Sequence, residues 1–371
     1  MKCVFLTAAC LTALTGSPLI AQSPAGDTAS KSDTSVTVTF GAFVDGYYAY
    51  DFSRPRNIDR AYTTQAVRHN EFNVNLAYVE AKVAGERVRG RLALQAGTSV
   101  QSNYSGEPAI GSVSGPDLAR LIQEAVAGFR LTPNLWIDGG IFLSHIGMEN
   151  WTSRDNLTYT RSLGAEYTPY YESGAKLTWQ ANPQLTGTFV VVNGWQNISE
   201  NNSDKAVGAR LDLAVSPATI FSYYNFVGKE NSTRNLRIFN GVGAKTTAIP
   251  GLTVQANADY GLQDKDNGGR SNWFSAVFIG KIQPSPMVGI SGRVETYHDP
   301  DQVIIVTGTD AGFKGTAASL GLDMQPLGST RAMWRNEVRG SWTSDPVFPS
   351  RDTGGVSAHN YLLVTSLAVT F

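Results

Sequence analysis

The feature that most constrains this chain is the strict alternation of side chains in its last eleven residues, YLLVTSLAVTF at 361–371. Apolar or aromatic residues occupy one parity: Tyr361, Leu363, Leu367, Val369 and Phe371. Successive side chains of a β-strand point to opposite faces, so this pattern predicts a strand with one apolar face. A strand that ends on an exposed Phe is typical of outer-membrane barrels, in which the last strand closes against the first and its aromatic end lies in the membrane girdle.

Similar alternating segments recur from residue 36 onward in a repeating order: about ten alternating residues, a tight turn, about ten more alternating residues, and then a longer polar stretch. In the first such segment, 36–52, the even-numbered residues are mostly apolar, whereas Asp45 and Asp51 have the opposite parity. Sixteen strands are predicted, at 36–52, 71–83, 88–98, 122–131, 135–144, 170–181, 185–194, 205–215, 219–229, 236–248, 252–263, 271–282, 287–298, 316–325, 330–343 and 358–371.

The lengths of the connections favour a membrane barrel. Short turns, often with Pro, alternate with longer polar loops, and both ends of the chain fall on the short-turn side. We therefore predict an all-β, transmembrane, antiparallel up-and-down β-barrel over residues 36–371, with short periplasmic turns and long extracellular loops. A soluble sandwich is the competing interpretation, but its loop lengths need not alternate. A helix over 117–127 is a local alternative, because Leu118, Leu121 and Ala125 have helical spacing.

The amino-terminal residues indicate export. Lys2 precedes an apolar run from Val4 to Leu14, and a cleavage region follows, so we predict a signal peptide at 1–21 and a disordered segment at 22–35. Cys3 and Cys10 both lie in the signal peptide; a lipoprotein cysteine at Cys10 is disfavoured because too little apolar sequence precedes it. The mature chain then has no disulfide and no thiolate metal site. The net charge of −1 lacks the positive excess that is typical of nucleic-acid-binding proteins.

Charged residues of the parity opposite to the apolar one are expected to face the lumen, because lipid would reject them. They concentrate on three consecutive strands, as Arg293 and Glu295, then Asp323, then Arg335, Glu337 and Arg339. Neighbouring strands are about 4.8 Å apart, so we expect ion pairs across this wall. Two interpretations stay open and are compatible: a charged constriction that orients permeating solutes, and a salt-bridge network that stiffens the barrel.

The long connection at 145–168 is the third long loop and the other candidate for a constriction. It carries polar and aromatic side chains, among them Glu149, Arg154 and Arg161. If this loop folds into the lumen, it narrows the pore; an ordinary surface loop is the alternative. The candidate pore-lining residues are Glu149, Arg154, Arg161, Arg293, Glu295, Asp323, Arg335, Glu337 and Arg339.

Tryptophans near the predicted strand ends fit aromatic girdles at the two membrane surfaces. Trp179 lies near a short turn, whereas Trp273 and Trp342 lie near long loops and share parity with apolar neighbours. Packing in the core of a soluble protein is the alternative for these three. Trp136 has the opposite parity.

Five segments in order resemble one known family: GGIFLSHIGMEN at 139–150, NLTYTRS at 156–162, PYYESGAKL at 169–177, RVETYHDPD at 293–301 and WRNEVRGSWTSDPVF at 334–348. Together they resemble the OmpL-like β-barrel porins of Gram-negative outer membranes. The resemblance spans nearly all of the mature chain and implies an outer-membrane porin, with no solute specified. One residue is inserted after Glu295 relative to the family pattern. General porins are trimers, so by analogy a homotrimer is expected.

We therefore expect a passive diffusion channel for small hydrophilic solutes and ions in the cell outer membrane. A structural or adhesive barrel that acts through its extracellular loops is the alternative. An enzyme is disfavoured, because the four histidines stand near predicted loops and no Gly-x-Ser-x-Gly or His-x-x-x-His motif occurs. The expected partners are outer-membrane lipid, lipopolysaccharide, and the barrel-assembly machinery through Phe371.

No cofactor or metal site is predicted. A calcium site at Asp299, Asp301 and Asp310 is the alternative, since hard cations take clustered carboxylates. The turn chemistry of an Asp-Pro pair accounts for the same residues.

Overall fold

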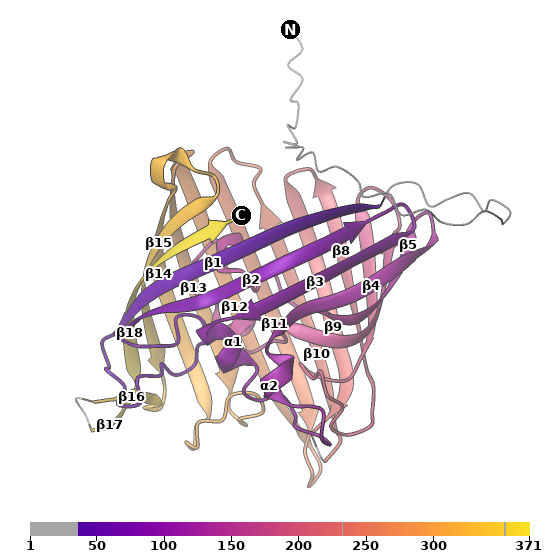
Figure 1. Cartoon of the computed structure of the whole chain (residues 1–371). Coiled ribbons are helices and arrows are strands. Elements are labelled where there is room, and N and C mark those ends of the chain that lie inside the picture. Colours follow the sequence, from indigo (N-terminus) through magenta and orange to yellow (C-terminus); the bar gives the residue numbers. More distant parts are fainter. Residues whose placement is uncertain (1–35, 232, 352–353) are drawn as a thin grey trace, which may run out of the picture.

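The structure, a computed structural model, describes residues 36–231, 233–351 and 354–371. Within them, sixteen antiparallel strands form one closed barrel (Figure 1). The strands are β1 (Thr37–Asp51), β2 (Phe72–Ala84), β3 (Val88–Ala96), β4 (Ile122–Thr132), β5 (Leu135–Leu143), β6 (Tyr171–Gln180), β7 (Leu185–Val192), β8 (Ala206–Ser216), β9 (Thr219–Glu230), β10 (Asn235–Thr246), β11 (Leu252–Asp264), β12 (Arg270–Ser285), β13 (Val288–Asp299), β14 (Phe313–Met324), β15 (Ala332–Thr343) and β18 (His359–Thr370).

Smaller elements lie in the connections. They are the hairpin of β16 (Phe348–Ser350) and β17 (Gly355–Ser357), the short helices α1 (Thr98–Asn103), α2 (Pro116–Ala119) and α3 (Leu163–Glu166), and two 3₁₀ turns at Ser153–Asp155 and Pro326–Gly328. The alternative helix over 117–127 is therefore limited to α2, and strand β4 begins at Ile122 as predicted. Among the described residues, no helix is long and apolar enough to cross a membrane. The predicted signal peptide at 1–21 and the segment 22–35 lie outside the described residues.

The barrel closes between its first and last strands, as the alternation predicts. β1 pairs with β18 in antiparallel register, with Tyr48 opposite Thr365 and Gly46 opposite Leu367. The pairing continues to the end of the chain, because the Phe371 N–H donates to the Ala42 carbonyl at 2.9 Å. Closure leaves neither strand with a free edge, which satisfies the requirement that backbone groups in a bilayer have partners.

Side-chain parity also follows the prediction. On β1, Phe40 and Val44 point outward and are exposed, whereas Asp45 and Asp51 point inward and are buried. On β1 the outer face is thus apolar and the inner face carries the charged residues, as a barrel that faces lipid requires. The connections at the end that holds the carboxyl terminus are short, and those at the opposite end are long (Figure 1). We refer to these as the short-turn end and the long-loop end.

Of the three tryptophans expected in aromatic girdles, Trp179 and Trp342 are 46% and 42% exposed and lie at opposite ends of the barrel. The prediction was wrong for Trp273, whose indole is 1% exposed and faces inward, stacked on Phe239 at 6.3 Å between ring centroids. Strand β12 carries apolar residues on both faces, so hydrophobicity alone does not determine its parity. Trp273 also needs Gly261 beside it, because a Cβ at that position would overlap the indole ring.

Candidate functional site

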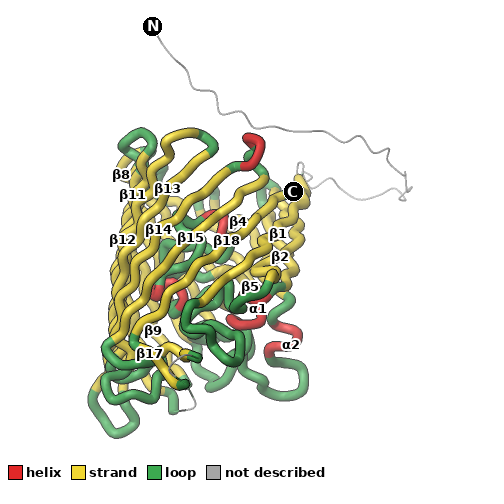
Figure 2. Tube along the Cα trace, turned by 90° about the vertical axis from the view of Figure 1, so that its left-hand side faces the viewer, coloured by secondary structure: helices red, strands yellow, loops and turns green. Residues whose placement is uncertain are grey.

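The candidate site is built around residues 144–170, the connection between β5 and β6, which we call the lumen loop. This loop folds into the barrel, and Figure 2 shows loop and helical segments within the outline of the strands. Its first residues are held at the wall: His145 Nδ1 lies 2.8 Å from the Glu172 carboxylate, and His145 Nε2 lies 2.7 Å from the Asn225 carbonyl. The Ser162 hydroxyl caps α3 by accepting the Ala165 N–H at 3.2 Å.

Arg335 on β15 anchors the deepest part of the lumen loop. Its guanidinium donates to the carbonyls of Ser153 and, at 3.1 Å, Asn156, and its Nε lies 2.9 Å from Asp323 on β14. Asp45 on β1 accepts the Ser153 hydroxyl at 2.7 Å from the other side. Arg335 is fully buried. The 3₁₀ turn at Ser153–Asp155 is therefore fixed between two walls by charged groups.

Glu337 and Arg293 hold the middle of the loop at Thr160. The Glu337 carboxylate accepts the Thr160 N–H at 2.7 Å and the Thr160 hydroxyl at 2.8 Å. Arg293 donates to the Thr160 carbonyl, to the Thr160 hydroxyl at 2.8 Å and to the Thr158 hydroxyl at 2.9 Å. Arg293 and Glu337 also pair with each other at 3.1 Å across the wall. All the polar groups of Thr160 are thus bound by two strands.

Glu295 and Arg339 bind the part of the loop nearest the long-loop end. Glu295 accepts the Leu163 N–H, and Arg339 donates to the Arg161 carbonyl at 3.2 Å. The two side chains pair with each other at 2.7 Å. Within the loop, the Glu149 carboxylate accepts the Ser162 N–H at 3.2 Å and the Ser162 hydroxyl. Burial raises the pKa of Glu149, although Arg293 and these hydrogen bonds oppose the shift.

Arg161 points from the lumen loop toward a second loop, 52–71. Its guanidinium lies 3.8 Å from the ring centroid of Tyr170 and 5.2 Å from that of Trp151, and it is fully buried. It donates to the Thr64 hydroxyl at 2.6 Å, and Glu166 accepts the Thr64 N–H at 3.0 Å. The two loops are therefore joined by a buried polar contact.

Arg154 extends in the opposite direction, toward the short-turn end. It donates to the hydroxyl of Thr370 on β18 and to the carbonyls of Thr330 and Arg331, the latter at 2.9 Å. The lumen loop consequently reaches from the long-loop ends of β5 and β6 to the short-turn end of β15 and β18.

Of the nine predicted pore-lining residues, six lie on the strands beneath the lumen loop and three belong to the loop. Glu149 lies within the loop, whereas Arg161 points toward loop 52–71 and Arg154 toward the short-turn end. The six strand residues do not face open water: each is at most 7% exposed, because the loop covers them. Cross-strand pairs of the predicted network are present, including Arg335–Asp323 at 2.9 Å.

Several partners of these residues were missed by sequence reasoning. They are the hydroxyls of Ser153, Thr158 and Thr160 and the carboxylate of Asp45, which bind the charged wall or the loop. Thr158 and Thr160 do lie in the NLTYTRS segment at 156–162, so their two-residue spacing was the available signal.

The opposite wall, on β2 to β8, differs in exposure. Several of its inward-facing charged side chains keep contact with solvent, although Asp138 and Glu172 are buried. The side chain of Lys82 is 52% exposed, that of Arg89 34%, and those of Arg210 and Asp212 22% each. Arg89 pairs with Asp138 and lies 4.5 Å from the ring centroid of Trp136, which faces inward as its parity predicts. Solvent therefore reaches this wall, whereas the loop covers the wall on β13 to β15.

The residues of the alternative calcium site have other partners. The Asp299 carboxylate stabilises the turn that follows β13 by accepting the N–H groups of Val303, Ile304 and Ile305 at 2.7–2.9 Å. Asp301 pairs with Lys265 at 3.0 Å. Within the described part of the chain, no three His, Cys, Asp or Glu residues are arranged to hold a metal ion.

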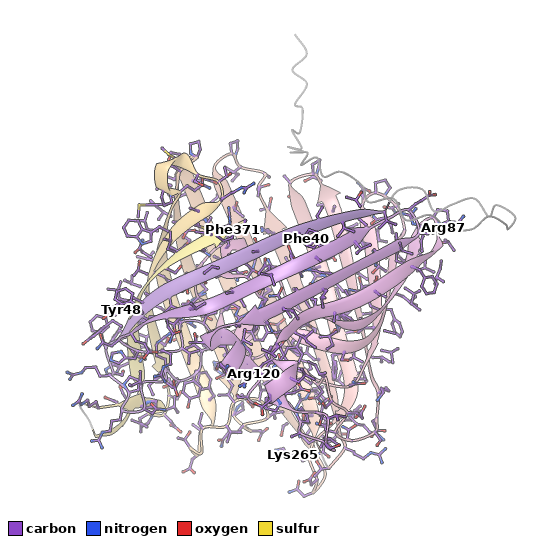
Figure 3. All side chains as sticks on the ribbon, viewed as in Figure 1. Phe40, Tyr48, Arg87, Arg120, Lys265 and Phe371 are labelled. Atoms are coloured by element: carbon purple, nitrogen blue, oxygen red, sulfur yellow. The ribbon has the colours of Figure 1, made fainter. Side chains whose placement is uncertain are left out.

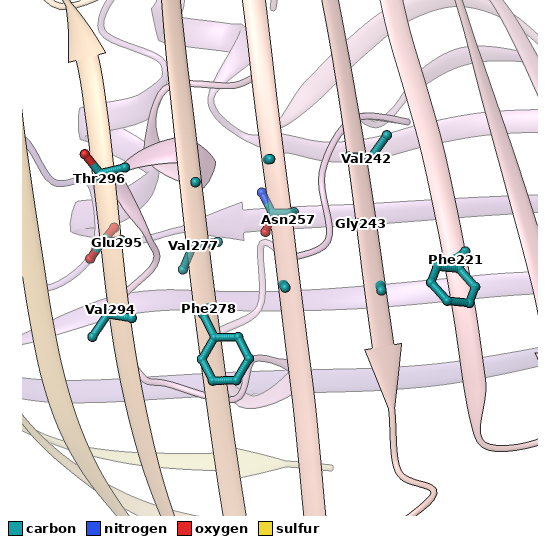
Figure 4. A pocket seen from close by; sticks show the side chains of 13 residues that line it. Phe221, Val242, Gly243, Asn257, Val277, Phe278, Val294, Glu295 and Thr296 are labelled. Atoms are coloured by element: carbon teal, nitrogen blue, oxygen red, sulfur yellow. The ribbon is translucent and has the colours of Figure 1, made fainter.

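A hollow of about 680 Å³ on β9 to β13 is apolar (Figure 4). Its floor is formed by small residues such as Ala256 and Ala276, between Phe221 and Phe278. These side chains have outward parity, so the hollow belongs to the lipid-facing surface and not to the lumen.

Comparison with solved structures finds similar barrels. The outer-membrane channel DcaP of Acinetobacter baumannii is 12% identical, with a TM-score of 0.59 over 92% of this chain and 99% of that one. The anion-selective porin of Comamonas acidovorans is 12% identical (TM-score 0.57; 91% and 100% covered), and so is Salmonella typhi OmpF in complex with daunomycin (0.58; 90% and 97%). At this identity, the likeness concerns the fold. Curated proteins give no match.

A family model provides the assignment. The model described as "Putative beta-barrel porin-2, OmpL-like" matches residues 37–371, which is the whole barrel. The family indicated by the five sequence segments is thereby confirmed. With its closed sixteen-stranded wall and a loop folded into the lumen, this chain belongs to the OmpL-like family of outer-membrane β-barrel porins.

Proposed function

We propose that this porin is a passive diffusion channel for small hydrophilic solutes and ions, and that the lumen loop determines the diameter of its pore. The observation that carries the proposal is the difference between the two inner walls. One wall, on β13 to β15, is covered by the lumen loop, and the other, on β2 to β8, keeps charged side chains in contact with solvent. A water-filled path between the loop and the exposed wall accounts for that difference.

In this mechanism the buried charges of β13 to β15 act on permeation through the loop. Arg293, Arg335 and Arg339 bind carbonyl groups of the loop, and Glu295 and Glu337 bind its N–H groups. These contacts hold an irregular segment at a fixed distance from the opposite wall. The size limit then comes from the loop position, and charge preference comes from the exposed wall.

The placement in the membrane follows from the same proposal. The short-turn end faces the periplasm and the long-loop end faces the exterior. The chain reaches the outer membrane by means of a signal peptide at 1–21, the barrel-assembly machinery reads Phe371, and the mature porin is a homotrimer surrounded by lipid and lipopolysaccharide. Trimeric porins among the similar folds support the oligomeric state by analogy alone.

Two measurements on the purified full-length protein test the channel. Planar bilayers report ion conductance, and liposome swelling with sugars of increasing size reports the bore. We expect conductance for both ion signs and swelling that falls with sugar size. A barrel that excludes neutral sugars and ions of both signs would refute the proposal and leave the adhesive or structural alternative.

A further inference from the structure

A polar pocket of about 630 Å³ lies outside the lumen, at the long-loop end of β1. It forms where loop 52–71 meets the connection that carries β16 and β17. The residues that matter for its chemistry are Tyr50, Arg54, Arg56, His69, Glu71 and Arg351. Tyr50 has the outward parity of β1, next to the inward and buried Asp51, so the pocket opens on the outer side of the barrel.

The pocket has a basic character: Arg56 and Arg351 line it together with Arg54, which has a further partner in the structure, and Glu71 is the one carboxylate among its described lining residues. That carboxylate is already engaged: Arg68 Nε donates to it at 2.8 Å and Asn73 Nδ2 donates to it at 2.8 Å. Like charges held together in this way favour an anionic ligand, and guanidinium groups match the geometry of phosphate oxygens.

His69 adds a neutral polar group to the pocket. Its Nδ1 accepts the Asp51 N–H at 3.0 Å, so that nitrogen carries no proton. Burial lowers the pKa of His69, which keeps the ring neutral at pH 7. The centroids of the His69 and Tyr50 rings are 5.1 Å apart.

Aromatic side chains line the outer wall at this end of the barrel. Tyr48 packs on Phe72 at 5.0 Å between ring centroids, and Tyr50 packs on Phe52 at 5.1 Å. Phe72 is 86% exposed and Phe52 is 54% exposed, so both present apolar rings to the surroundings. Figure 3 shows Tyr48 at the outer edge of the barrel toward the long-loop end. Aromatic belts of this kind lie at the level of lipid headgroups, which places the pocket at that level.

We propose that this pocket binds the phosphorylated headgroup of an outer-leaflet lipid. The arginines at 56 and 351 contact the phosphate oxygens, and the acyl chains lie against the aromatic rings beside β1. Basic pockets at a membrane interface recognise lipid headgroups by this combination of charge and apolar contact. The inference rests on the outer-membrane placement proposed above, but it does not depend on whether the barrel conducts.

The test compares two double variants of the full-length protein in detergent. Arg56→Gln with Arg351→Gln removes two pocket charges. Arg234→Gln with Arg270→Gln is the matched control, because both arginines are exposed at the long-loop end and each pairs with a carboxylate away from the pocket. Binding is titrated with bis-phosphorylated lipid A, with lipid A lacking its phosphates, and with inorganic phosphate.

We expect the pocket variant to bind bis-phosphorylated lipid A about 25-fold more weakly than wild type, at roughly fivefold for each arginine. The control stays within about twofold, and wild type loses a similar factor when the lipid lacks its phosphates. Equal binding by the pocket variant, or equal binding of the two forms of lipid A, overturns the proposal. Inorganic phosphate that binds as tightly as the lipid also overturns it, because the site would then take a free anion. Bilayer conductance of the pocket variant, measured in parallel, separates this result from failure of the channel proposal.

Discussion

Glu337→Gln is the substitution that most directly tests how the lumen loop is held. The carboxylate accepts three hydrogen bonds: the Thr160 N–H at 2.7 Å, the Thr160 hydroxyl at 2.8 Å and Arg293 Nη2 at 3.1 Å. A glutamine amide has the same shape but replaces one oxygen with a donor group. In one orientation that group faces the Thr160 N–H, and in the other it faces the Arg293 guanidinium. Either way a donor meets a donor, and Arg293 loses one of its two buried counter-charges, since Glu295 still lies 3.1 Å from its Nε.

The expected cost follows from the burial of these groups. Because Arg293 keeps Glu295 as a partner, the cost is that of a buried donor left without its acceptor, about 1–3 kcal/mol. The barrel itself is held by strand pairing that Glu337 does not alter, so the cost is expected to appear in local release of residues 158–162. Hydrogen exchange at the Thr160 amide should accelerate by roughly fivefold to a hundredfold. Because the loop narrows the pore in the proposed mechanism, single-channel conductance should rise.

Glu80→Gln is the matched control, since Glu80 is also an inward-facing acid but pairs with Arg91 and Lys82 instead of the lumen loop. It should leave exchange of the loop unchanged. The measurements are exchange by mass spectrometry on peptides covering 153–163 and conductance in planar bilayers, with folding of each variant checked by its heat-modifiable migration on gels. A folded Glu337→Gln barrel with wild-type exchange at 158–162 would refute the reasoning.

Two further predictions concern pH and packing. Burial raises the pKa of Glu149 above its ordinary value of 4.5, so its contribution to loop docking is complete below that value and is lost as the pH rises through the raised pKa. Hydrogen exchange of peptides over 149–162, corrected for intrinsic rates, should therefore slow on acidification. Glu149→Gln stays neutral at every pH and should remove this pH dependence. If the variant keeps the pH dependence of the wild type, the assignment to Glu149 is contradicted. Gly261→Ala should lower the thermal midpoint by displacing the indole of Trp273, at a cost of about 1–3 kcal/mol. Gly280→Ala, where an added Cβ meets no atom within 4 Å, is its control, and equal midpoints for the two variants would argue against close packing at Gly261.

Where the two faces of a strand differ, alternation alone predicted which way its side chains point. Strand β11 is an example, because Leu252 to Leu262 alternate with polar residues and the observed strand covers Leu252–Asp264. Strand β12 has Val277 and Ile279 inside and Phe274 and Phe278 outside, so the orientation of Trp273 depends on packing against neighbouring strands.

The position of the lumen loop could not be predicted in the same way. The sequence identified Arg293, Arg335 and Arg339 as a charged wall, but their loop partners include the carbonyls of Ser153, Asn156 and Arg161. Every residue has a carbonyl, so side-chain patterns carry no signal for such contacts. Only the contacts of the Thr158 and Thr160 hydroxyls depend on the type of side chain, so only these contacts leave a signal in the sequence.

The need to satisfy backbone groups explains why the wall beneath the loop is charged. A loop inside a barrel has few strand partners for its own N–H and C=O groups, and each buried group left unpaired costs about 1–3 kcal/mol. An apolar wall would leave the Asn156 carbonyl and the Thr160 and Leu163 N–H groups in that state. Arginines satisfy the carbonyls and glutamates satisfy the N–H groups, while cross-strand pairing compensates their own charges. The ion pairs that brace the strands are the same groups that position the loop. In the proposed channel, constriction and stiffening of the wall, considered separately at the level of sequence, would therefore be two consequences of one set of contacts.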